Sequence, residues 1–104
     1  MRLLVDHEGL TVRLTDERLA HILEHPEMAG LEDSIAETLA RPRRIVQPAS
    51  DDTVRLYYRL CRGTRVGDKL ICVALKVRPG DAFVLTAYLT DKPKKGTLLW
   101  SADT

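Results

Sequence analysis

Cationic and phenolic side chains alternate with apolar ones along three stretches of the C-terminal half of the chain. Arg55 and Arg59 lie in the first stretch, Lys76 in the second, and Thr86 and Tyr88 in the third. Neighbouring side chains of an extended chain point to opposite faces, so these five groups are predicted to emerge on one face of a sheet. Arginine offers a fork of N–H donors that fits phosphate oxygens, and lysine adds positive charge. The pattern predicts a surface that binds a phosphodiester.

Aromatic and lysine side chains extend the same predicted surface. Tyr57 and Tyr88 are suited to stacking on a splayed base or donating a hydrogen bond, and Thr86 is suited to holding a phosphate oxygen. Three lysines follow the third stretch as a cationic rim: Lys92, Lys94 and Lys95. A plainer interpretation stays open, because the solvated face of any antiparallel sheet favours Arg, Lys, Thr and Tyr. Lysines beside an edge strand also prevent edge-to-edge aggregation.

Two histidines, His21 and His25, are four residues apart in a predicted helix and lie with Arg18 along one flank of its apolar stripe. The spacing permits metal binding, but no Glu follows His21 directly, so the HExxH pattern is absent. An exposed or capping role is therefore expected, and neither a metal site nor a cofactor is predicted. His25 is suited to carrying a proton near neutral pH only if its helix end reaches the sheet surface. Glycine-rich phosphate loops and the GxSxG pattern are also absent.

Length and composition restrict the class of protein. The chain has 104 residues, with 16 Lys and Arg against 15 Asp and Glu, for a formal net charge of +1. This length fits a single domain over residues 1–104, and the balanced charge gives no global field that would mark a nucleic-acid-binding protein. Most acids lie in residues 1–40 and most bases in residues 41–100. Cys61 and Cys72 lack the spacing of a zinc site and are expected to pack as reduced thiols.

The sequence shows no sign of targeting to a membrane. No apolar run is long enough for a membrane span, and the N-terminus lacks the charged, apolar and small-residue regions of a signal peptide. A cytoplasmic protein without membrane contact is therefore expected.

The hydrophobic pattern predicts two helices with strands around them. Thr15 is a candidate N-cap with acidic residues in the next turn, and Pro26 is expected to end that helix near His25. A second helix is predicted over about 31–40 from apolar residues at four-residue spacing, with a proline at position 42. The remaining segments are predicted as a hairpin within 2–14, strands at about 43–47, 53–61, 69–77 and 82–90, and an extended tail at 97–100.

The alternating pattern also predicts how the strands are aligned. Even-numbered apolar residues of 54–60 are expected to share a face with odd-numbered ones of 71–77. A three-residue hairpin loop over 79–81 would add the odd-numbered apolar residues of 83–89 to this face.

The predicted fold is α+β. Two N-terminal helices, within about 15–40, are expected to pack on one face of a curved, mainly antiparallel sheet of four or more strands, within about 43–100. The opposite face is expected to form a shallow groove that carries the charged groups.

The chain resembles the phage-encoded branch of the Barnase-EndoU-colicin-RelE-like nuclease superfamily in four segments: LTDERLAHILEHPEM, VRLYYR, LICVALKV and FVLTAYLTDKPKKGTLLW. The resemblance covers roughly Leu14 to Trp100 and rests on the order and spacing of these segments. It implies a ribonuclease-toxin-like fold and RNA cleavage that needs no metal. Carried over by position, it points to His21, His25, Arg59, Lys76, Thr86 and Tyr88. Leu19 stands where many relatives carry a bulky aromatic residue.

The resemblance and the charged face together lead to one principal expectation, a toxin-like endoribonuclease that uses the 2′-hydroxyl of RNA to expel the 5′-oxygen. Arg55 and Arg59 would stabilise developing charge, while Lys76 would orient the phosphate. Tyr88 or a histidine would move the proton. The alternative is a module of the same fold that binds RNA or a protein without cleavage. A third interpretation adds a partner, an acidic inhibitor or antitoxin-like protein that covers the basic face.

Overall fold

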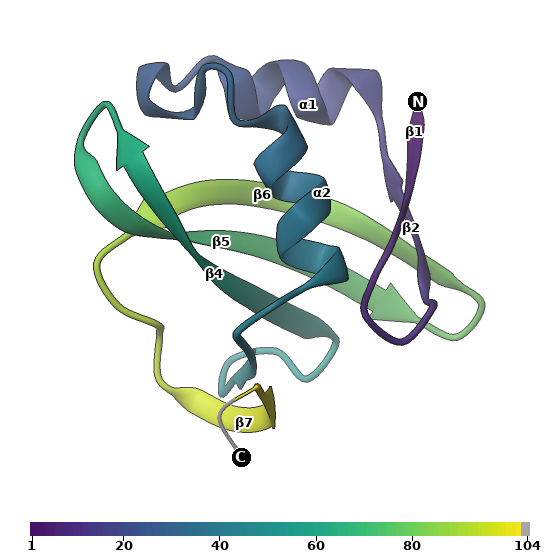
Figure 1. Ribbon diagram of the computed structural model, residues 1–104. Coiled ribbons are helices and arrows are strands. Elements are labelled where there is room, and N and C mark those ends of the chain that lie inside the picture. Colours follow the sequence, from purple (N-terminus) through teal and green to yellow (C-terminus); the bar gives the residue numbers. More distant parts are fainter. Residues whose placement is uncertain (103–104) are drawn as a thin grey trace.

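The computed structural model describes residues 1–102. Within this range the chain forms seven strands, two α-helices and one short 3₁₀ turn, η1 (Figure 1). In chain order the elements are β1 (Arg2–Val5), β2 (Thr11–Leu14), α1 (Asp16–Leu23), η1 (Pro26–Met28), α2 (Glu32–Ala40), β3 (Arg44–Pro48), β4 (Val54–Thr64), β5 (Gly67–Arg78), β6 (Asp81–Thr90) and β7 (Gly96–Ser101). Every predicted helix and strand is present within a few residues of its expected bounds. Neither of the described helices has the length and apolar character that crossing a membrane requires.

Local sequence signals set both ends of α1. The Thr15 hydroxyl accepts a hydrogen bond from the Arg18 amide at 3.1 Å, which satisfies one of the donors that a helix leaves open at its N-terminus. Two acidic residues occupy the first turn, where the helix dipole favours negative charge. His25 precedes Pro26 and has an extended backbone, with φ −75° and ψ 118°. The predicted cap and the predicted end of this helix are confirmed.

The seven strands form one sheet in the order β1-β2-β6-β5-β4-β3-β7. β2 and β6 are parallel and the other neighbours are antiparallel, so the sheet is mixed. The predicted architecture, two N-terminal helices packed on a mainly antiparallel sheet of four or more strands, is wrong, because the α+β fold has two helices and a seven-stranded mixed sheet. The prediction failed because nothing in the local pattern of β2 indicates that it pairs with β6.

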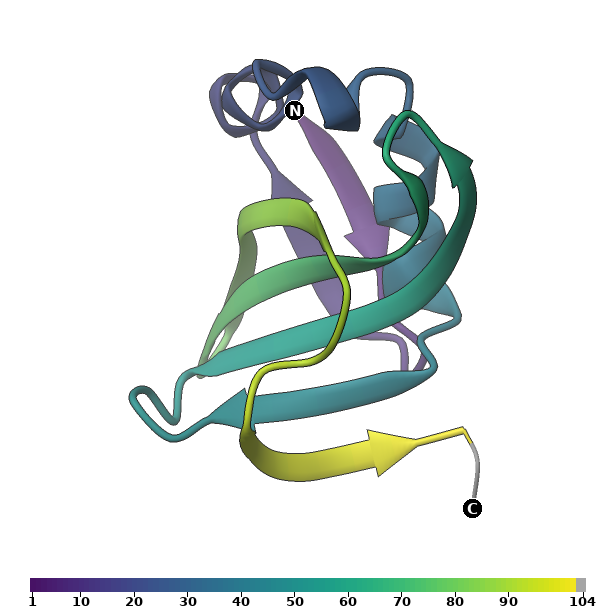
Figure 2. The same ribbon diagram turned by 90° about the vertical axis from the view of Figure 1, so that its left-hand side faces the viewer.

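The sheet is curved, so that its first hairpin comes close to the strands at its other end, and both helices lie against it. α1 lies along β6, and α2 lies over β5 and β4 (Figure 1). The sheet bends strongly (Figure 2). His7, in the turn after β1, stacks at a tilt on Trp100 of β7, with ring centroids 4.6 Å apart. The neighbouring Asp6 accepts a hydrogen bond of 2.8 Å from the Tyr57 hydroxyl of β4. The first hairpin therefore contacts strands at the other end of the sheet.

A bulge sets the alignment of β4 and β5. At the turn Thr64 pairs with Gly67, which is the alignment that the prediction required, but the register shifts by one residue just before Thr64. Gly63 lies in this bulge with φ +66°, a conformation that favours glycine. Beyond the bulge Tyr57 pairs with Val73, so odd-numbered residues of β4 share a face with odd-numbered residues of β5. The predicted pairing of even with odd residues is wrong.

The β5–β6 hairpin departs from the prediction only near its turn. Its loop has two residues, between Arg78 and Asp81, rather than the three predicted. The register shifts again at Leu85, and beyond this bulge Ala87 lies in the helix-side core as expected. Phe83, on the turn side of the bulge, lies on the opposite face. Two one-residue shifts thus decide which side chains of β4 and β6 share a surface.

Each face of the sheet carries its own apolar cluster. On the helix side, Ile22 of α1 and Ile35 of α2 pack with Tyr57 and Val73 in the larger cluster. On the face away from the helices a smaller cluster contains Val46, Leu56, Tyr58, Cys72 and Ala74. The face that was predicted to be a polar groove is therefore partly a second core.

Candidate functional site

The structure separates the three groups on which the predicted site depended. Arg59 pairs with Ile71 and lies on the helix side of the sheet, whereas Lys76 and Tyr88 lie on the opposite face. The bulge in β4 is the cause, because a one-residue shift moves a side chain to the other face relative to its neighbours. The expectation of a common face is wrong, and each group has partners of its own.

Arg59 binds the C-terminal end of α2. Its Nη1 donates to the carbonyl oxygen of Arg41 at 2.8 Å, and its Nη2 lies 3.0 Å from Oε1 of Glu37. Arg41 is the C-cap of α2, where carbonyl oxygens lack helical partners and attract cations. Arg59 therefore ties β4 to α2, and the Glu37 carboxylate offsets its charge.

Lys76 anchors the loop between β3 and β4. Its Nζ lies 3.0 Å from Oδ2 of Asp51. Hydrogen bonds from the hydroxyl and amide of Thr53, with a further one from Lys76, lower the pKa of Asp51 to about 2. The ammonium group that was predicted to orient phosphate thus has a carboxylate partner.

Tyr88 ends a row of side chains on the face away from the helices. Arg44 pairs with Tyr58, Tyr58 with Cys72, and Cys72 with Tyr88. The Tyr88 hydroxyl is buried beside Cys72 and Tyr58 without a well-formed hydrogen bond. Burial and then the neighbouring thiol raise the pKa of Tyr88, and burial raises the pKa of Tyr58 to about 12. A buried phenol in this state is a poor proton carrier at neutral pH.

The segment between β6 and β7 covers this row and carries the predicted lysine rim. The Lys94 amide donates to the Tyr58 hydroxyl at 3.0 Å. The Lys94 ammonium lies 5.8 Å from the centroid of the Tyr88 ring, within the range of a cation–π contact. Lys92 and Lys95 are exposed on either side. The segment therefore crosses the face away from the helices (Figure 2).

The other residues predicted to contact substrate are divided between the two faces. Thr86 pairs with Ala74 on the same face as Tyr88 and is half-buried. Tyr57 is buried on the helix side, where burial raises the pKa of its hydroxyl, and Arg55 interacts with the same phenol. Arg55 and Tyr57 therefore lie on the helix side of the sheet, and the prediction that they share a face with Thr86 and Tyr88 is wrong.

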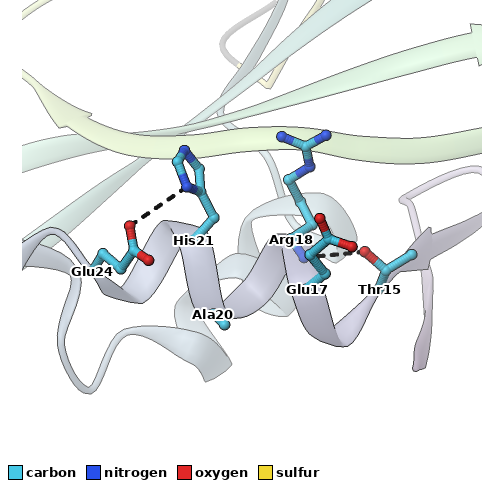
Figure 3. A pocket seen from close by; sticks show the side chains of 6 residues that line it. All are labelled: Thr15, Glu17, Arg18, Ala20, His21 and Glu24. Atoms are coloured by element: carbon cyan, nitrogen blue, oxygen red, sulfur yellow. Dashed lines mark hydrogen bonds and ion pairs between the residues drawn. The ribbon is translucent and has the colours of Figure 1, made fainter.

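His21 and Arg18 line an open hollow along α1 (Figure 3). Both side chains rise from the helix toward β6 (Figure 3). Nδ1 of His21 lies 3.6 Å from Oε2 of Glu24, and the His21 and His25 ring centroids are 6.4 Å apart. Among residues 1–102 no group of His, Cys, Asp and Glu side chains is arranged to hold a metal ion. The hollow and its margin combine two imidazoles and a guanidinium, groups that exchange protons and bind anions, with the carboxylates of Glu17 and Glu24.

A second group of cations surrounds the ends of β3 and β4, and sequence analysis did not identify it. Three adjoining hollows, of about 350, 210 and 360 Å³, all include Leu60 in their lining. Four arginines line one or more of these hollows and are called here the arginine surface: Arg43, Arg44, Arg59 and Arg62. The run RPRR at 41–44 carried a signal for this surface in the sequence, but its proline indicated only where a helix ends.

The charge of the arginine surface is only partly neutralised within the protein. Glu37 pairs with Arg59, whereas Arg44 and Arg62 pair with no carboxylate in the described part of the chain. Pro93 lines the same hollow as Arg44, so the lysine-bearing segment lies beside this surface. Arginines at the start of β3 and in the C-terminal part of β4 thus converge on one region, with Pro93 of the lysine-bearing segment at its margin.

Comparisons of this chain with protein-family models, with curated proteins and with solved structures find no match. The resemblance to the phage-type nuclease superfamily therefore stays a prediction. The geometry of the arginine surface and of the α1 hollow carries the functional argument.

Proposed function

We propose that this chain is an RNA-binding module that holds single-stranded RNA on the arginine surface and on the lysine-bearing segment beside it. The observation that carries the proposal is the convergence of four arginines from the start of β3 and the C-terminal part of β4. Arg44 and Arg62 pair with no carboxylate in the described residues, so their guanidinium forks are available to phosphate oxygens. Each fork can hold two oxygens of one phosphate.

The exposed Leu60 favours single strands over duplexes as the ligand. It lies in the middle of the arginine surface, where an apolar side chain has nothing to contact on the phosphate backbone of a duplex. The bases of a single strand can turn toward the protein and place an apolar face on such a residue. A surface of arginines around an apolar centre is therefore better matched to splayed nucleotides.

Salt dependence and charge-removing variants test the proposal. Fluorescence anisotropy with a labelled single-stranded RNA should give an affinity that falls with salt, by about 0.7 in log–log slope for each phosphate contacted. The Arg44→Gln, Arg62→Gln double variant should bind several-fold more weakly and with a slope reduced by about 1.4. Arg78→Gln, at the far end of β5 from the arginine surface, is the matched control and should keep the wild-type slope.

An acidic protein partner would bind the same cations, so it should compete with RNA for the arginine surface in the anisotropy measurement. Absence of RNA binding at low salt, or an equal loss in the control variant, contradicts the proposed function.

Cleavage of RNA is a second candidate function, and the specific observation that favours it is the pair of imidazoles beside Arg18 on α1. One imidazole would take the proton of the 2′-hydroxyl as its oxygen attacks phosphorus, and the bond from phosphorus to the 5′-oxygen would break. The other imidazole would protonate the departing 5′-oxygen, leaving a 2′,3′-cyclic phosphate. Arg18 would offset the charge that develops on the phosphorane.

Incubation with total RNA in the presence of EDTA tests this candidate. If the α1 hollow cleaves RNA, His21→Ala and His25→Ala abolish cleavage while the binding measured by anisotropy is retained. His7→Ala provides the matched control, because His7 stacks on Trp100 away from α1. Cleavage that survives in both α1 variants excludes the α1 hollow as the site of cleavage, and binding without any cleavage supports an RNA-binding module that does not cleave.

A further inference from the structure

We propose that the hollow between Leu60, Leu70 and Pro93 holds a nucleobase of the bound RNA strand. The inference rests on the RNA-binding function proposed above and extends it from phosphate contacts to a base subsite. The hollow measures about 350 Å³, and its lining also includes Arg43, Arg44 and Tyr58. This size lies at the lower end of the range for small-molecule sites.

The walls of the hollow come from two paired strands and one crossing segment. Leu60 of β4 pairs directly with Leu70 of β5, which places two apolar side chains side by side on the face away from the helices. Pro93 belongs to the segment that crosses this face. The Lys94 amide fixes that segment to the Tyr58 hydroxyl by a hydrogen bond of 3.0 Å. The apolar walls are thus held in place before a ligand arrives, which lowers the entropy cost of binding.

The composition of the hollow matches a nucleotide better than a purely apolar ligand. Leu60 is 43% exposed, so an aromatic ring placed on it would remove apolar surface from water. Arg44 lines the same hollow and pairs with no carboxylate in the described residues, so it can neutralise a phosphate attached to that ring. Tyr58 is almost fully buried, so it forms a wall rather than a stacking platform. An apolar floor beside a free cation is the complement of a flat base joined to a phosphate.

An abasic strand isolates the contribution of the bases. The full chain is titrated with a labelled single-stranded RNA and with a strand of the same length and charge that lacks its bases. Wild-type protein should bind the intact strand about tenfold more tightly. Leu60→Ser should reduce this preference to about twofold or less, because it removes the apolar floor without changing any charge, and Leu60→Met should restore it.

Leu3→Ser is the matched control, since Leu3 is an exposed leucine on β1 at the opposite edge of the sheet. It should keep the tenfold preference. Equal affinity of wild-type protein for both strands, or an unchanged preference in Leu60→Ser, overturns the base subsite while leaving RNA binding in place. Failure to bind either strand overturns the proposed function and the subsite with it. Circular dichroism confirms that each variant is folded.

Discussion

Tyr57 and Asp6 illustrate how a residue with functional chemistry can have a structural use. The Tyr57 hydroxyl is buried and donates to a carboxylate oxygen of Asp6, whose other oxygen accepts amide hydrogens of its own turn. A buried carboxylate requires such donors, because an unsatisfied charged group is costly inside a protein. The pair therefore fixes the first hairpin to β4, and its burial keeps it from contacting a ligand.

Tyr57→Phe is expected to lower the free energy of unfolding by about 1–3 kcal/mol, since it leaves one oxygen of Asp6 without its donor. Urea denaturation measures the change. Combining Tyr57→Phe with Asp6→Asn gives a double-mutant cycle, in which the second change should cost less once the first is present. Strictly additive costs would show that the two side chains do not interact in solution.

The lowered pKa of Asp51 predicts how the free energy of unfolding changes in acid. Because hydrogen bonds in the folded state lower its pKa to about 2, the group stabilises the fold above about pH 4 and loses this effect as the pH falls toward 2. Unfolding free energies measured between pH 5 and pH 2 should therefore fall more steeply for the wild type than for Asp51→Asn. Asp52→Asn, at the exposed neighbouring position, should retain the wild-type slope. Parallel curves for the wild type and Asp51→Asn would exclude this source of stability.

At the scale of elements, backbone irregularities control the surface more than the strands themselves do. The bulge at Gly63 places Arg59 on the helix side, and the bulge at Leu85 returns Ala87 to the core. Both irregularities are single residues within otherwise regular ladders. The alternation of apolar residues continues through them in sequence, so a pattern of period two does not reveal them.

Two glycines should respond differently to a methyl group. Gly63→Ala meets no atom within 4 Å and should cost about 1–2 kcal/mol from its positive φ alone. Gly96→Ala has no such φ, but its Cβ would clash with the carbonyl oxygen of Gln47 on β3, so β7 must shift. Amide hydrogen exchange should then increase in β3 and β7 of Gly96→Ala and remain unchanged there in Gly63→Ala. Equal exchange in both variants would argue against the close approach of these two strands.

At the scale of the whole molecule, the first hairpin contacts the last strand, which brings the two ends of the sheet together. His7 and Trp100 stack at 4.6 Å although they come from opposite ends of the strand order. Trp100 is the single tryptophan in the sequence, so its fluorescence reports on this closure.

A small protein whose described strands all belong to one sheet should unfold in one cooperative step. Trp100 fluorescence and circular dichroism should give the same midpoint in urea, because the strand that carries Trp100 belongs to the same sheet as β4 and β5. His7→Ala should shift the Trp100 emission to the red, since it removes a covering ring, whereas His21→Ala should not. Separate midpoints would show that β7 unfolds independently of the rest.

The candidate site was only partly predictable from the sequence, because the partners of its charged groups come from distant segments of the chain. The lysines were expected to form a cationic rim beside Lys76, but Lys76 pairs with Asp51, and the segment that carries the lysines contributes Pro93 to a hollow lined by Arg43 and Arg44. The partners of Arg59 and Lys76 come from α2 and from the β3–β4 loop. A residue's own strand gives no information on which distant carboxylate will neutralise it.

The order and limits of the helices and strands follow from local chemistry that the amino-acid sequence contains, such as the Thr15 cap, Pro26 and the alternation in β4 to β6. The pairing of β2 with β6, the two register shifts and the partners of the charged groups arise only when distant segments pack together. Burial of Tyr57 and Val73 in one core selects the observed face, because adjacent side chains of a strand point to opposite faces and cannot both enter it. For that reason the local sequence predicts the helices and strands, whereas only the folded sheet determines which side chains form the candidate functional surface.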